Sequence, residues 1–147
     1  MIIVYRGCDV DAQLDQKAAE RLTDRIRGLF KSLKPKGFIG SLSAGADILF
    51  GLAALDELPT SVLQNPTNGE FVEWLLPFDA QTFRGTRVEP AGEPWIDHYD
   101  RLSSLPEVAV GHANLDHTGA SVDKQHNAAL LDRAQALGRQ LDQRVWI

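Results

Sequence analysis

The sequence has little cysteine, no long apolar run and no excess of positive charge. Cys8 is the single cysteine among 147 residues, which excludes an internal disulfide framework and a paired-cysteine zinc or redox site. Such cysteine usage fits a reducing cytoplasm, the location that we expect. No apolar run approaches the roughly 18 residues of a transmembrane helix, and the first apolar run is too short for a signal peptide. We therefore expect no membrane association.

The charge balance narrows the choice of partner. Fifteen Lys and Arg against 20 Asp and Glu leave a net charge of −5, so we do not expect nucleic acid as a partner, because its phosphates would be repelled. His112, His117 and His126, with Asp116 and Asp123, could be drawn as a metal cluster. No helix places the first two histidines on one face, and no zinc-helix motif is present. We predict no metal site and no cofactor.

What the chain does contain is an alternation of strand and helix patterns. Its length predicts one domain spanning residues 1–147. Short apolar runs predict strands at 2–5, 38–42, 70–76, 107–110 and 144–147, and helical spacing predicts helices at 14–33, 46–57, 94–105 and 122–143. Residues 59–69 read as a surface loop, and 78–90 as a polar segment with one helical turn at 80–83. The alternation predicts an α/β, Rossmann-like three-layer fold, with a mainly parallel sheet of about five strands and helices on both faces.

Residues 38–55 form the most informative stretch, because a strand, a turn of small residues and a helix follow one another. A helix N-terminus presents unpaired N–H groups and the positive end of its dipole, which favours phosphate. We predict that this turn cradles a phosphate through Gly40, Ser41, Ser43, Ala44 and Gly45. Asp47 would repel that phosphate, so we expect it to bond backbone amides and organise the turn.

Further candidates follow the other strands, where parallel sheets bind ligands. Arg84 and Arg87 are expected in one such loop, where at least one guanidinium would bind phosphate. Gly7 can bring backbone close to a ligand. Cys8 is more often a packed residue than a nucleophile in this position. Ser43 also approximates a nucleophile elbow, although a serine replaces the first glycine of that motif.

The order of motifs resembles the SLOG superfamily, whose Rossmann-like domains are related to the Lonely Guy cytokinin-activating enzymes and to bacterial DNA-processing protein A. The resemblance covers residues 38–147. Its motifs are S-L-S-A-G-A-D-I-L at 41–49, Leu76-Pro77-Phe78 and F-R-G-T-R-V at 83–88, followed by Trp95, Tyr99, Leu102, Asn127, Leu131, Ala134 and Leu137.

The resemblance implies that the chain binds a nucleotide or nucleotide derivative above the sheet, as a bacterial ligand sensor or signalling domain. It adds Pro77, Phe78 and Asn127 to the candidate ligand-binding residues. Lonely Guy relatives are commonly dimers, which suggests a homo-oligomer by analogy. The alternative is a Lonely Guy-like phosphoribohydrolase. The catalytic Pro-Gly-Gly-x-Gly-Thr signature of that enzyme is missing, and the candidate acids Asp9, Asp47 and Glu89 lie in no recognised motif.

Overall fold

Five short strands pair side by side, and every pair is parallel. The computed structural model describes residues 1–7, 15–65 and 69–147. The strands are β1 (Ile2–Tyr5), β2 (Gly37–Gly40), β3 (Phe71–Leu76), β4 (Ala109–His112) and β5 (Val145–Trp146), in the order β4-β3-β2-β1-β5. The sequence prediction of a parallel five-stranded sheet is confirmed.

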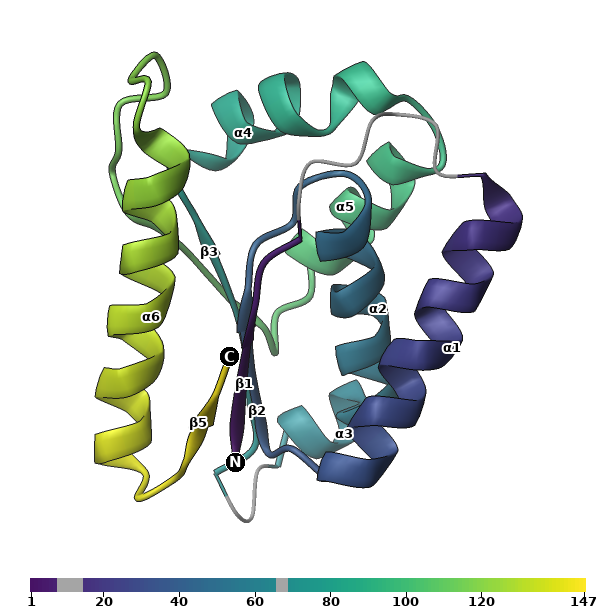
Figure 1. Cartoon of the computed structure of the whole chain (residues 1–147), viewed down its shortest axis with the longest axis vertical. Helices are drawn as coiled ribbons and strands as arrows, with labels where there is room; N and C mark the ends of the chain where they lie inside the picture. The colour runs from purple at the N-terminus through teal and green to yellow at the C-terminus, as the bar shows by residue number, and fades with distance from the viewer. Residues whose placement is uncertain (8–14, 66–68) are drawn as a thin grey trace.

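Helices cover both faces of this sheet, as predicted (Figure 1). The helical elements are α1 (Gln16–Leu33), α2 (Ala46–Glu57), α3 (Thr60–Leu63), α4 (Ala80–Arg87), the 3-10 helix η1 (Glu89–Ala91), α5 (Trp95–Ser103) and α6 (Val122–Gln140). The long helix α6 lies on one face and α1 and α2 lie on the other, whereas α4 crosses the end at which the strands finish. The result is the three-layer arrangement expected from the alternation of elements. In the part of the chain that is described, no helix has the length and apolar character needed to cross a membrane.

Successive side chains of each strand serve two separate cores, because they point to opposite faces. Ile3 and Tyr5 of β1 join the larger core beneath α1 and α2. Ile2 and Val4 join the smaller one beneath α6. Trp74 is fully buried in the larger core, and its indole N–H donates to the carbonyl of Leu102 at 3.0 Å, so this side chain serves packing.

The order in which the chain adds strands to the sheet changes direction at β1. From β1 the chain adds β2, β3 and β4 in turn on one side, and β5 then pairs with the free side of β1. Ligand crevices of open parallel sheets lie at such a reversal, beyond the carboxyl ends of the strands. In this chain that place lies above β1 and β5, next to the first turn of α6.

Two segments differ from the sequence prediction. The predicted single turn at 80–83 is a full helix, α4, because Asp79 caps it by accepting from the N–H of Thr82 at 2.9 Å and Phe83 anchors it in the core. The predicted loop at 59–69 contains α3, where the carbonyl of Pro59 starts a helical turn that buries Leu63. Each of these helices is stabilised by burial of one apolar side chain. The polar residues around that side chain made both segments read mainly as loops in the sequence.

The remaining differences are shifts of element ends. The first helix begins at Gln16 because Asp15 caps it by accepting from the N–H of Ala18. The last helix ends at Gln140, since Asp142 adopts a φ of 50°. β4 begins two residues later than expected, and β2, β3 and β5 are each shorter than their predicted runs.

Candidate functional site

A pocket of about 550 Å³ opens at the point where the strand order reverses. Its polar rim comes from Arg6 and Gly7, which follow β1, and from Asp123 and Asn127 in the first turns of α6. Its apolar wall is formed by Val4 of β1 and by Leu130 and Leu131 of α6, with Tyr5 and Ile147 also lining it. A pocket with one charged rim and one apolar wall suits a ligand with both kinds of surface.

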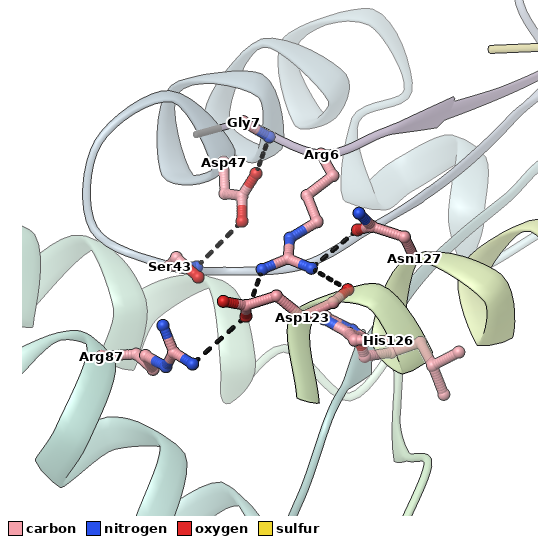
Figure 2. A network of polar contacts seen from close by, with 9 residues as sticks. Arg6, Gly7, Ser43, Asp47, Arg87, Asp123, His126 and Asn127 are labelled. Atoms are coloured by element: carbon pink, nitrogen blue, oxygen red, sulfur yellow. Dashed lines mark hydrogen bonds and ion pairs between the residues drawn. The ribbon is translucent and has the colours of Figure 1, made fainter. Parts of the chain in front are cut away.

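Arg6 spans this pocket from β1 to α6 (Figure 2). One terminal nitrogen donates to the main-chain carbonyl of Asp123 at 2.8 Å and to the side-chain oxygen of Asn127 at 2.7 Å. The other donates to the Asp123 carboxylate at 2.7 Å. The Arg6 side chain is only 17% exposed, so these bonds hold its guanidinium in one place on the pocket rim.

Arg87 approaches the same carboxylate from the last turn of α4 (Figure 2). Its guanidinium donates to Oδ1 of Asp123 at 3.2 Å, the oxygen that also accepts from Arg6. Arg87 lies 36 positions before Asp123 along the chain, and Arg6 lies 117 positions before it. The tertiary structure thus gathers two cations around one acid at the carboxyl ends of the strands.

The electrostatics of this cluster follow from those contacts. The hydrogen bond from Arg6, and the charges of Arg87 and Arg6, lower the pKa of Asp123, so its carboxylate is ionised at neutral pH. His126 is buried beneath it, with Nε2 2.6 Å from the carbonyl oxygen of Leu75. Burial lowers the pKa of His126 to about 4, which keeps the imidazole neutral and leaves the arginines as the cations of the cluster.

The predicted phosphate turn at 40–47 is organised by Asp47, as expected from the sequence. The Asp47 carboxylate is 2% exposed and accepts from the backbone N–H of Gly7 and, at 3.3 Å, from that of Ser43. The N–H of Ala44 donates to the carbonyl of Arg87 at 3.2 Å. The amides of Ser43 and Ala44 are therefore already used within the chain, and phosphate binding by this turn stays a prediction.

The small residues of the turn have structural reasons to be small. A Cβ on Gly40 would lie 2.3 Å from Cζ of Tyr5, and one on Gly7 would lie 2.6 Å from Cβ of Ala46. Gly45 adopts a φ of 105° where α2 begins. Ser41 is fully buried, and its hydroxyl has no hydrogen-bond partner among the described residues. This compact turn ties the end of β1 to the start of α2.

The other predicted site residues lie apart from the pocket. Arg84 and Arg87 were expected in a loop, but both are on α4. The guanidinium of Arg84 bonds to both carboxylate oxygens of Asp100, at 2.8 and 2.9 Å, and also to Glu89. Pro77 and Phe78 are buried, and the Phe78 ring packs against the buried ring of Phe83 and the exposed ring of His117. Cys8 and Asp9 lie outside the described residues.

Sequence reasoning missed the two residues that organise the pocket rim, Arg6 and Asp123. Both carried a signal, because one follows the first strand directly and the other lies in the first turn of the last helix. Gly7 and Asn127 were predicted and line this pocket, and the predicted Arg87 lies outside the lining but bonds to Asp123 on its rim. The histidine cluster gives no metal centre, because the described part of the chain contains no group of three or more His, Cys, Asp or Glu placed to hold an ion.

Comparisons with known proteins add no relative. No family model, curated protein or solved structure matches this chain. The resemblance to the SLOG superfamily therefore rests on the motifs in the sequence alone.

Proposed function

We propose that this chain binds a nucleotide or nucleotide derivative in the pocket above β1 and β5, as a ligand sensor of the bacterial cytoplasm. The observation that carries the proposal is the convergence of Arg6 and Arg87 at the reversal of strand order. Guanidinium groups match the geometry of phosphate oxygens. The crevice at such a reversal is where sheets of this class bind their ligands.

The lining of the pocket supports a nucleotide in particular. Arg6 on the rim, together with Arg87, which reaches the rim through Asp123, would hold the phosphate. The apolar wall of Val4, Leu130 and Leu131 would contact the flat face of a base or the carbons of a sugar. Asn127 carries a side-chain amide on the rim. Its oxygen accepts from Arg6, and its NH₂ group can donate to a base edge or a ribose hydroxyl. A ligand with a charged end and an apolar ring therefore uses the whole pocket.

Two of the candidate catalytic acids are already bonded within the chain, which favours ligand binding over hydrolysis. Asp47 accepts from two backbone amides, and Glu89 is paired with Arg84. A general acid or base needs a carboxyl group that can reach the reacting atoms, and the bonds of Asp47 and Glu89 direct both carboxylates elsewhere. Asp9, the third candidate acid, lies outside the described residues. The bonds of the two described acids support a ligand-binding domain over a phosphoribohydrolase.

Isothermal titration calorimetry with AMP, ADP, cyclic AMP, NAD and ADP-ribose tests the proposal. At least one of these nucleotides should bind the wild type, and Arg6→Gln or Arg87→Gln should weaken that binding by about tenfold or more, the effect of losing a charged hydrogen bond of ~1.5–3 kcal/mol. Arg84→Gln is the matched control for Arg87→Gln. It removes the same charge from the same helix, but its partners are Asp100 and Glu89.

Equal loss of affinity in the Arg84 and Arg87 variants would show that the charge of α4, and not the pocket, attracts the ligand. Failure of the wild type to bind any nucleotide of the panel would refute the proposal. Release of free base or phosphate during the titration, followed by chromatography, would establish the hydrolase instead.

A further inference from the structure

Three sources of positive potential meet at the Asp123 carboxylate. Arg6 and Arg87 both donate to its Oδ1, and Asp123 lies in the first turn of the 19-residue helix α6, where the helix dipole favours an anion. Two further buried titratable groups lie near this cluster in the described part of the chain, and both are bonded to other groups. His126 packs beneath as a neutral ring, and Asp47 bonds Gly7 and Ser43 instead.

The exposure of these three side chains is uneven. Asp123 is 54% exposed, whereas Arg6 is 17% and Arg87 is 22% exposed. The arginines are thus held in the protein, and the carboxylate reaches them from the solvent side. An ion pair whose acid is exposed to water contributes little to stability, so the carboxylate can be replaced by a stronger anion.

The bonds of Arg6 are divided in a way that allows this exchange. One terminal nitrogen is fixed by the Asp123 carbonyl and the Asn127 side chain, both of which are independent of the carboxylate. The other nitrogen bonds the carboxylate. When the carboxylate leaves, Arg6 keeps its position and presents one free N–H edge to the pocket.

We propose that Asp123 occupies the place of the ligand's anionic group, so that a terminal phosphate displaces its carboxylate from Arg6 and Arg87. This inference rests on the proposed function and specifies the ligand class as a phosphomonoester. A ligand carboxylate or phosphodiester carries one negative charge, the same as the Asp123 carboxylate, so it would gain nothing in charge by displacing that carboxylate. A phosphomonoester carries a charge of about −1.5 to −2 at pH 7, and its surplus charge and third oxygen favour the exchange.

The test is a titration of the full chain with AMP, with inorganic phosphate and with cyclic AMP, followed by backbone amide shifts and calorimetry. Asp123→Asn keeps the size of the side chain and removes its charge. This variant should bind AMP and phosphate about tenfold more tightly than the wild type, because the resident competitor is gone. Asp132→Asn, on the same helix and exposed, is the matched control and should change neither affinity by more than about twofold.

Two further comparisons complete the test. Adding Arg87→Gln to Asp123→Asn should abolish the gain, since the gain requires the arginines. The wild type should bind AMP at least about tenfold more tightly than cyclic AMP, which carries the same base and sugar but one charge fewer.

The outcomes separate this inference from the proposed function. Nucleotide binding that Asp123→Asn leaves unchanged or weakens would overturn the displacement and keep the nucleotide pocket. Cyclic AMP binding as tight as that of AMP would overturn the phosphomonoester class. The absence of binding by both the wild type and Asp123→Asn would refute the inference and the proposed function together.

Discussion

The ring of Tyr5 lies directly over Gly40, its partner in the register of β1 and β2. A Cβ built on Gly40 would come within 2.3 Å of Cζ and 2.5 Å of Cε2 of that ring. The ring itself stacks on Phe50 of α2, with ring centroids 4.7 Å apart. Gly40 is therefore needed for packing between the sheet and α2, which gives it a role independent of any ligand.

Gly40→Ala should destabilise the chain strongly. The added methyl group overlaps a ring that is stacked on Phe50, so we expect a loss of about 3 kcal/mol in the free energy of unfolding, the upper end of the usual cost of overpacking. Urea denaturation measures this loss. In a Tyr5→Leu background the same substitution should cost about 1 kcal/mol or less, because the overlapping atoms are gone. An equal cost in both backgrounds would mean that backbone conformation, and not the Tyr5 ring, requires the glycine.

Tyr5→Phe should leave stability unchanged or raise it by about 1 kcal/mol. The Tyr5 hydroxyl is buried and has no hydrogen-bond partner among the described residues, so its removal relieves an uncompensated loss of hydration. Tyr5→Ala removes the ring as well and should cost roughly 3–5 kcal/mol. Thermal and urea unfolding of both variants would check the pair. A loss above about 1 kcal/mol in Tyr5→Phe would reveal a partner for the hydroxyl.

Two buried groups should oppose each other in the pH dependence of stability. Burial raises the pKa of Asp47 to about 6 and lowers that of His126 to about 4. Between pH 4 and 6 the folded chain holds a proton on Asp47 that the unfolded chain releases, so this group adds stability as the pH falls. The unfolded chain protonates His126 below about pH 6.5 and the folded chain does not, so that group subtracts stability over the same range.

Single substitutions should separate the two effects. Between pH 6.5 and 4.5 we expect Asp47→Asn to lose about 2 kcal/mol of unfolding free energy and His126→Gln to gain a similar amount, while the wild type changes less than either. The measurement is urea unfolding at pH 6.5, 5.5 and 4.5, and the slope with pH is compared rather than the absolute stability. Parallel slopes in all three proteins would contradict the assignment of these protons.

In the ion pair between Glu73 and Arg133, the carboxylate is buried and depends on its cation, whereas the arginine is half-exposed. Arg133 of α6 donates to both carboxylate oxygens of Glu73, at 2.7 and 2.8 Å, and the Glu73 side chain is 10% exposed. Arg133→Met leaves that carboxylate without its cation and should cost about 2 kcal/mol. Adding Glu73→Leu should recover most of the loss, because β3 then meets α6 through apolar side chains. Chemical denaturation of both variants tests this, and a double variant no more stable than Arg133→Met would contradict it.

Local patterns in the sequence were enough for the order of elements and for much of the turn after β2. The helix predicted at 46–57 and the strand predicted at 2–5 agree with the structure at both ends, since their apolar periods and terminating residues are local features. The organising role of Asp47 also followed from a local argument, the repulsion between a carboxylate and a phosphate. The polar segment at 78–90 was harder, because its helix depends on burying Phe83 in a distant core.

The pocket rim was decided by tertiary structure alone. Arg6 follows β1, Arg87 ends α4 and Asp123 lies in the first turn of α6, and no short sequence pattern links these three positions. They meet because β5 pairs with β1 on the side opposite β2, and because α6 therefore crosses the face beside β1 with its first turn at the carboxyl ends of the strands. Local composition does not specify strand order, which depends on how all the apolar faces are buried together. Local patterns thus specified the elements and the end of the sheet at which we propose a ligand site, whereas the packing of α6 against β1 brought together the side chains found there.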